Sequence, residues 1–219
     1  MKIYAPLNAI KAISNLAATK DIRYYLNGVY IRANATQTTI VATDGHVLGV
    51  YKNKQENEID DGQYYDFILP LDTVKNLKPA HRIKDELVEF EFTPIDHMKV
   101  TSVKVNSVSI KMLSATVDGR FPDWQRVLVK EVSNTVGNYD PELLARFIKV
   151  AKEFDKKPHD VILHQNGDNS AAITIDQIYN FIGVIMPIRS SVVPAYEGCN
   201  RFFDQPPVII KPVLEKEAA

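Results

Sequence analysis

The sequence predicts an α+β protein built from three copies of one unit. In each copy an extended segment is followed by an amphipathic helix and three short strands, over residues 2–51, 65–113 and 135–187. A connection that contains proline and tryptophan, 117–130, separates the second copy from the third. The copies share their order of elements but little residue identity, which indicates stacked half-domains with continuous sheets.

The first copy begins with a short extended segment at 2–5. Apolar residues recur at helical spacing from Leu7 to Ala17, with Lys11 and Asn15 on the opposite side, and predict a helix over 7–18. Alternating apolar and β-branched residues predict strands at 29–32, 39–42 and 47–51. The residues at 34–37 and 44–45 are of the types that form turns.

The second copy follows a polar, acidic segment, 52–62, that we expect to be a loop. A strand is predicted at 65–70, and a short helix at 71–77 with Asp72 as a possible N-cap. Pro79 should end that helix because proline cannot continue it. Three more strands are expected at 87–92, 98–103 and 108–113.

The connection 117–130 reads VDGRFPDWQRVLVK. Gly119 permits a sharp turn, and Pro122 holds Phe121 in an extended conformation. Phe121 and Trp124 are too large and apolar to remain in water, so they should be buried against neighbouring surfaces.

The third copy is expected to open with an extended segment at 135–139. Asp140 should cap the next helix, with Pro141 at its first position. Strands are predicted at 161–164, 171–175 and 181–187, with a turn at 166–169. We therefore expect domains at 1–118 and 119–189 and a proline-rich tail at 190–219, whose apolar residues argue against pure disorder.

The composition is that of an ordinary globular protein of 219 residues, with 45% hydrophobic and 24% charged residues. The net charge of −1 carries no global sign of nucleic-acid binding, so a basic face would require segregation of 26 Lys and Arg from 27 Asp and Glu. Cys199 is the one cysteine, which excludes a disulfide framework within the chain. The N-terminus is unlike a signal peptide and no apolar stretch reaches 18 residues, so we expect a reducing, cytoplasmic setting.

Four strings of residues carry a family resemblance: DIRYYLNG at 21–28, VATDGHVL at 41–48, VDGRFPDWQRVL at 117–128 and VIMPIR at 184–189. Together, and in this order, they resemble the β subunit of bacterial DNA polymerase III, the sliding clamp. The resemblance implies the DNA-clamp fold, with antiparallel sheets outside and helices on one face. Residues 1–118 resemble the whole middle domain of such clamps, and about 131–189 resemble the second half of the last domain.

The resemblance also implies a groove that takes short peptides from polymerases and clamp-loader proteins. Its positions match Leu26, Thr43, Gly45, His46, Leu48, Pro122, Arg126, Val127, Val184, Met186, Pro187, Ile188 and Arg189. Two residues depart from the family pattern, Val47 in place of arginine and Val129 in place of proline. The alternative is that these residues only pack the junction between domains.

In clamps of this family the helices surround duplex DNA. The resemblance therefore implies that basic residues on and near the predicted helices of this chain contact DNA. The candidates are Lys11, Lys20, Arg23, Lys75, Lys78, Arg82, Lys84, Arg146, Lys149, Lys152, Lys156 and Lys157. Such side chains meet phosphates without reading sequence. The alternative is a lysine-rich surface that serves solubility, because Glu142, Glu153 and Asp155 share the third helix.

Catalysis is not expected. Asp44 and His46 fit no triad spacing, and Asp44 is better explained as the cap of its own turn. The histidines His81, His97, His159 and His164 lack paired metal-ligand spacing, and no glycine-rich phosphate loop occurs. We therefore expect no cofactor, and the resemblance implies an accessory protein of a DNA polymerase.

The predicted function is that of a sliding-clamp-like processivity factor for a DNA polymerase. The alternative is an interaction module that has the peptide groove but does not form a ring around DNA, and that competes with clamps for their protein partners. The resemblance matches only the second half of the clamp's last domain. Without the first half, a sheet edge and an apolar helix flank around Leu144, Phe147 and Ile148 should lack a partner. The tail is the spare segment, so we expect it to pack on 131–189.

Overall fold

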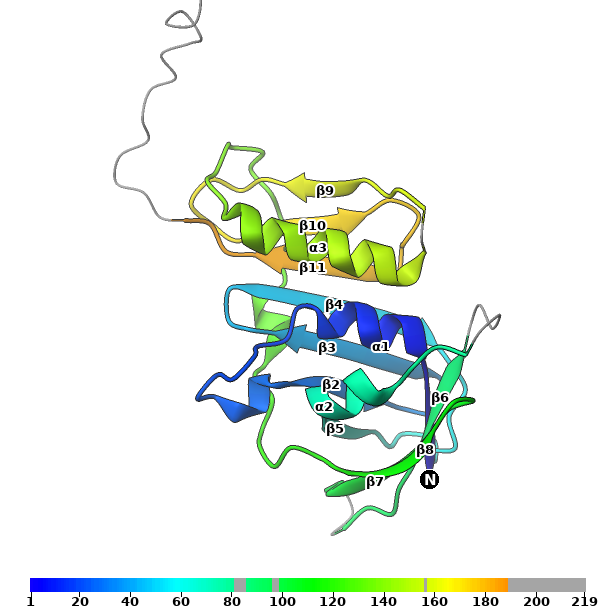
Figure 1. Cartoon of the computed structure of the whole chain (residues 1–219). Helices are drawn as coiled ribbons and strands as arrows, with labels where there is room; N and C mark the ends of the chain where they lie inside the picture. Colours follow the sequence, from blue (N-terminus) through cyan, green and yellow to red (C-terminus); the bar gives the residue numbers. More distant parts are fainter. Residues whose placement is uncertain (81–85, 96–98, 156, 189–219) are drawn as a thin grey trace, which may run out of the picture. The chain divides into compact units, whose positions relative to one another are not determined.

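The computed structural model describes residues 1–80, 86–95, 99–155 and 157–188 (Figure 1). Along these residues the order of elements is β1 (Lys2–Pro6), α1 (Leu7–Ser14), β2 (Gly28–Ala33), β3 (Gln37–Thr43), β4 (Val47–Lys54), β5 (Tyr65–Pro70), α2 (Leu71–Asn76), β6 (Leu87–Glu91), β7 (Ser102–Asn106), β8 (Lys111–Ala115), α3 (Pro141–Phe154), β9 (Val161–His164), β10 (Ala171–Ile175) and β11 (Phe181–Ile185). The strands form a seven-stranded sheet, β5-β2-β3-β4-β11-β10-β9, and a four-stranded sheet, β1-β6-β7-β8, with antiparallel pairing between neighbours. The predicted α+β class is confirmed.

The first two copies of the unit interlock through their leading strands. β1 precedes the first helix, yet it pairs with β6 of the second copy. β5 precedes the second helix and pairs with β2 of the first copy. Each half therefore completes the sheet of the other.

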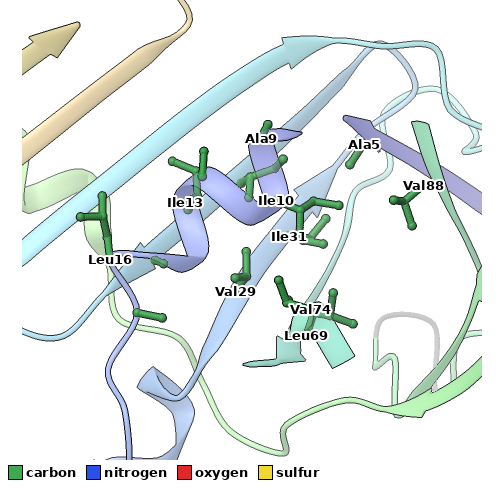
Figure 2. Close-up of a cluster of buried hydrophobic side chains, with 14 of the residues drawn as sticks. Ala5, Ala9, Ile10, Ile13, Leu16, Val29, Ile31, Leu69, Val74 and Val88 are labelled. Atoms are coloured by element: carbon green, nitrogen blue, oxygen red, sulfur yellow. The ribbon is translucent and has the colours of Figure 1, made fainter. Parts of the chain in front are cut away.

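The main core contains inward-facing residues of the helices and of both sheets. Ile10, Ile13 and Leu16 are fully buried and pack with Val29 and Ile31 of strand β2 (Figure 2). Their spacing of three residues places them on one face of α1 and of the turn that follows it. Burial of this apolar face packs α1 against the sheet.

The third copy joins the same sheet, because β11 pairs with β4 from Phe181 opposite Tyr51 to Ile185 opposite Val47. Its helix α3 packs beside α1 on one face of that sheet (Figure 1). Asp140 caps α3 by accepting a hydrogen bond from the amide of Glu142 at 2.8 Å, and Pro141 occupies the first turn, as predicted. The continuous sheet expected from the repeats is confirmed.

The first helix is shorter than predicted. α1 ends at Ser14 and not at residue 18. The side-chain amide of Asn15 donates to the carbonyls of Lys11 and Ala12, at 3.0 and 3.2 Å. These bonds satisfy carbonyl oxygens that a longer helix would have used.

The second copy differs from prediction in its cap and in two strands. Asp72 is not the N-cap, because Pro70 holds that position and Asp72 pairs with Lys75 within the helix. β7 and β8 begin at Ser102 and Lys111, several residues later than predicted. The turn from Ser107 to Ile110, closed by an amide-to-carbonyl bond of 2.9 Å, sets where they meet.

The extended strand predicted at 135–139 is wrong, since the structure has no strand there. Its counterpart β5 pairs with β2 of a preceding half. The described residues contain no such half for the third copy. The segment instead bonds to the β9–β10 turn, where Gly167 donates to Thr135, and to Ile188, which donates to Asn138.

Several predictions fall outside the described residues. They concern the packing of the tail 190–219, the histidines His81 and His97, and the site residues Arg82, Lys84, Lys156 and Arg189.

Candidate functional site

A second apolar cluster lies on the face of the larger sheet opposite the helices. Neighbouring residues of β3 show the division, because Ile40 belongs to the helix-side core and Val41 to this second cluster. The cluster contains three predicted groove residues, Leu26, Leu48 and Val184, all buried. They come from three segments that are far apart in the sequence.

The connection between the second and third copies covers this face. Phe121 stacks on Tyr30 with ring centroids 4.8 Å apart, and Trp124 is buried in the same cluster. Leu128 and Val129 pack against it with part of their surface exposed. The prediction that Phe121 and Trp124 are buried is confirmed.

The turn between β3 and β4 carries polar candidates. Asp44 caps it by accepting hydrogen bonds from the amides of His46 and Val47, at 2.7 and 2.9 Å. Gly45 has a φ of +97°, which favours glycine at this position. The carbonyl of His46 accepts a bond of 2.9 Å from the amide of Met186, so the turn meets the end of β11.

The groove candidates therefore divide into a buried set and an exposed set, which we call the floor and the rim of the candidate groove. Val127, Met186 and Ile188 are large apolar residues with 44%, 43% and 50% of their surface exposed. The other described candidates, partly or fully exposed, are Thr43, Gly45, His46, Pro122, Arg126 and Pro187. Val47, which replaces the family arginine, is buried in the helix-side core and adds no polar group to the rim.

The basic candidates gather on the side of the helices. A hollow of about 830 Å³ is lined by six of them, Lys11, Lys20, Arg23, Lys75, Arg146 and Lys149, together with Asp21, Asp44 and Glu153. Lys78, Lys152 and Lys157 are exposed but do not line it. His46 also lines this hollow, so the turn between β3 and β4 borders both candidate surfaces.

The guanidinium group of Arg146 is engaged in interactions within the protein. Its guanidinium pairs with the carboxylate of Asp44 and donates to the carbonyls of Asn15 and Ala17, both at 2.9 Å. Arg23 bonds Asp21 at 2.7 Å and the carbonyl of Asp44 at 3.0 Å. These arginines thus order the turn that carries His46.

The titration of these groups follows from the same contacts. Burial would raise the pKa of Asp44, but the amides of Val47 and His46 and the charge of Arg146 outweigh burial and lower it. The hydrogen bonds from Arg23 lower the pKa of Asp21 to about 2. Both carboxylates are therefore ionised at neutral pH.

Sequence reasoning missed a further hollow of about 780 Å³ beside the connection. Tyr30 and Asp66 line it and share a hydrogen bond of 2.5 Å, and Arg32 lies 4.1 Å from the ring centre of Tyr64. Burial and the bond to Asp66 raise the pKa of the Tyr30 phenol. Their alternation along β2 and β5 is an ordinary strand pattern, so no sequence signal marked them.

Among the residues that the structure describes, no group of His, Cys, Asp and Glu side chains is arranged to hold a metal ion. Within the same ranges, no helix has the length and apolar character needed to span a membrane.

Comparison with known proteins shows to which family the chain belongs. A family model described as the central domain of the DNA polymerase III beta subunit matches residues 6–123. The chain belongs to the DNA polymerase III beta subunit family. The predicted resemblance of the first domain to the clamp's middle domain is thereby confirmed.

Two curated relatives of this family are beta sliding clamps. That of Haemophilus influenzae is 31% identical over 132 residues, which cover 60% of this chain and 34% of the relative. That of Vibrio cholerae is 31% identical over 157 residues, which cover 72% of this chain and 40% of the relative. The chain thus matches well under half the length of these relatives.

Solved clamp structures share the fold. The crystal structure of the DNA polymerase sliding clamp from Pseudomonas aeruginosa superposes with a TM-score of 0.61 at 18% identity, covering 87% of this chain and 67% of that chain. A Pseudomonas aeruginosa clamp bound to griselimycin gives the same TM-score and covers 66% of that chain. The DNA-clamp fold therefore extends beyond the segment matched by sequence.

Proposed function

We propose that this chain is a sliding-clamp-type processivity factor that binds peptide motifs of polymerases and clamp loaders and contacts duplex DNA without sequence preference. The observation that carries the proposal is the meeting of three distant segments, at Leu26, Leu48 and Val184, on one covered sheet face. Membership of the DNA polymerase III beta subunit family supports it. Catalysis would belong to the bound polymerase.

The groove has the features that a short apolar peptide needs. The residues of the proposed floor are buried, and Val127, Met186 and Ile188 of the proposed rim leave apolar surface in water. A methionine side chain adapts its shape to different partners. The backbone bond between Met186 and His46 joins the end of β11 to the turn between β3 and β4, and the exposed imidazole of His46 is the polar group that we assign to fixing the orientation of the peptide.

The helix side supplies the proposed contact with DNA. Lys149 and Lys152 are exposed on α3, and within the described residues neither makes an ion pair. Lysines of this kind contact phosphates of any sequence. Arg146 is a weaker candidate than its position on α3 suggests, because its donors are already engaged.

A fluorescent synthetic peptide that carries the clamp-binding segment of a bacterial replicative polymerase tests the groove. Met186→Asp is tolerated in the free protein, but a bound peptide would bury the carboxylate without a partner, so affinity should fall by about tenfold or more. Leu113→Asp is the matched control, since Leu113 is 71% exposed on β8 of the other sheet. Equal affinity of the wild type and Met186→Asp overturns the groove assignment.

A second candidate function is that of a module that binds the same partners without forming a ring. It is favoured by β9, which has one neighbour, β10, among the described strands. Light scattering, which measures the mass of the protein with and without circular DNA, distinguishes the processivity factor from the module. A mass that fits a closed oligomer and retention on circular DNA support the processivity factor, whereas a monomer that binds peptide but slides off supports the module.

A further inference from the structure

A third hollow, of about 420 Å³, lies next to the hollow beside the connection. The residues that line both hollows are Arg32, Tyr64, Trp124 and Gln125. Among the described residues that line the third hollow, none belongs to the groove candidates or to the basic candidates for DNA. It is therefore a surface separate from both candidate sites.

Strand register brings two basic side chains of this hollow to the same face of the larger sheet (Figure 1). Arg32 of β2 lies opposite Thr39 of β3, and Thr39 lies opposite Lys52 of β4. Each of them is two residues along its strand from a member of the apolar cluster that the connection covers, so all point to the face opposite the helices. Two strand spacings separate the backbone of Arg32 from that of Lys52 by about 10 Å.

Aromatic rings hold both cations in place. The guanidinium of Arg32 lies 4.1 Å from the ring centre of Tyr64, and the ammonium of Lys52 lies 6.0 Å from the ring centre of Trp124. Contacts of this kind attract a cation to the ring without neutralising its charge. Within the described residues neither cation makes an ion pair, so each keeps its charge for a bound anion.

The carboxylates nearby leave these charges uncompensated. Asp66 of β5 lies opposite Arg32, but it accepts the hydroxyl of Tyr30 at 2.5 Å and forms no ion pair with Arg32. Among the described residues that line the hollow, Asp61 is the one acidic residue, and it is exposed to water. The balance of charge therefore favours an anionic occupant.

The aromatic rings favour an acidic peptide over a single-stranded nucleic acid. Proteins that bind single strands stack bases on open aromatic faces. Here Trp124 has 6% of its surface exposed, and the guanidinium of Arg32 covers one face of Tyr64. The rings thus orient the cations and offer little surface to a base, whereas a carboxylate needs only the cations.

The hollow lies close to the rim of the candidate groove. Trp124 and Gln125 line the hollow, and Arg126 and Val127 of the same single-turn 3-10 helix belong to the rim. This helix rises about 2 Å per residue, so Gln125 and Val127 are separated by roughly 4 Å along it. A peptide that leaves the groove past Val127 therefore needs about three or four extended residues to reach the hollow.

We propose that this hollow binds an acidic stretch of a partner protein, next in sequence to the peptide that occupies the groove. Arg32 and Lys52 each pair with a carboxylate of that stretch. The hollow then adds recognition of charge to the apolar recognition of the groove, and it distinguishes partners with acidic flanks from partners without them. The inference rests on the proposed function, since the groove peptide brings the acidic stretch to the hollow.

Fluorescence anisotropy with two labelled peptides tests the proposal. Both carry the clamp-binding segment of a bacterial replicative polymerase. One is extended at each end by a Gly-Ser spacer and a run of aspartates, and the other by the same spacer and an equal run of asparagines. The wild type should bind the aspartate peptide roughly three- to tenfold more tightly at low salt, which is the effect expected of two exposed ion pairs. The preference should disappear in about 1 M salt, which screens such pairs.

Three variants locate the preference. Arg32→Gln/Lys52→Gln should bind the two peptides equally and keep the wild-type affinity for the asparagine peptide. Lys104→Gln/Lys111→Gln is the matched control, since it removes the same charge from exposed positions of β7 and β8 in the other sheet, and it should keep the preference. Lys52→Gln alone leaves the contact of Arg32 with Tyr64 intact and should reduce the preference roughly two- to threefold.

Each result supports or overturns the proposal. A full preference for the aspartate peptide in Arg32→Gln/Lys52→Gln or in Lys52→Gln overturns it. Equal binding of both peptides by the wild type also overturns it and leaves the groove in place. If the wild type binds neither peptide, the proposed function fails and this inference fails with it. Binding of an oligothymidylate that is lost in Arg32→Gln/Lys52→Gln and kept in the control assigns the hollow to nucleic acid, which likewise contradicts the proposal.

Discussion

Gly49 of β4 and Gly183 of β11 lie directly opposite each other in the strand pair that joins the third copy to the first. A Cβ atom at Gly49 would overlap the side chain of Leu16, and one at Gly183 would overlap the ring of Phe147. The paired glycines therefore let α1 and α3 approach the sheet closely at the junction. The continuous sheet depends on this close packing.

Gly183→Val should destabilise the protein by roughly 1–3 kcal/mol, because the added side chain must displace Phe147 and Ile173 from a closely packed core. Chemical denaturation measures the free energy of unfolding. Ala115→Val serves as control, since Ala115 is exposed in β8 and the change there should stay within about 0.5 kcal/mol. Equal stability of the two variants contradicts the role of the glycine pair.

Arg146→Ala should lower stability by roughly 2–4 kcal/mol, because it leaves Asp44 and two carbonyls without their donor. It should also weaken peptide binding, since the turn that holds His46 loses its anchor. Lys149→Ala, on an exposed position of the same helix, is the control and should change stability little. An Arg146→Ala protein that keeps its stability and loses only DNA affinity would place this arginine in the DNA contact instead.

Asp44 should make stability depend on pH. Its pKa in the folded protein lies below the ordinary value of 3.8, so the unfolded chain takes up its proton first as the pH falls. The stabilisation is therefore complete above about pH 5 and is lost as the pH drops through the folded pKa. The difference in unfolding free energy between wild type and Asp44→Asn should shrink below pH 4, and a difference that stays constant from pH 6 to pH 3 would refute this.

The double variant Lys149→Glu/Lys152→Glu should abolish binding to duplex DNA at low salt, because it replaces two phosphate contacts with repulsive charges. Lys54→Glu/Lys111→Glu has the same change in net charge but alters residues at the end of β4 and the start of β8, which lie outside α3. Fluorescence anisotropy over a series of salt concentrations measures both. If both pairs reduce affinity equally, the effect is one of net charge and the helix face is not the contact.

Some elements of the fold could be predicted because local chemistry decides them. The α3 cap needs only the carboxylate of Asp140 and the fixed φ of Pro141, which lie within three residues of the amide they serve. β9 and β10 were predicted at their observed bounds because short turns flank alternating residues. For the site, the turn capped by Asp44 was predictable for the same reason.

Other elements could not be predicted because their cause lies far away in the sequence. The strand expected at 135–139 had suitable residues, but the part of the chain that the structure describes holds no neighbouring half with which it could pair. The partner of Arg146 is 102 residues away, so nothing near α3 distinguished a structural arginine from one that faces DNA.

By itself the sequence determined the repeated order of elements, the apolar faces of the helices, the capped turn and the family, since each depends on residues a few positions apart or on strings such as DIRYYLNG and DGRFPDW. The tertiary structure alone decided that Gly49 meets Gly183 and that Arg146 reaches Asp44. It also showed that Leu26, Leu48 and Val184, which the family resemblance had assigned to one groove, are buried in one cluster. The physical reason is that strand pairing and packing join residues whose separation along the chain leaves no local pattern.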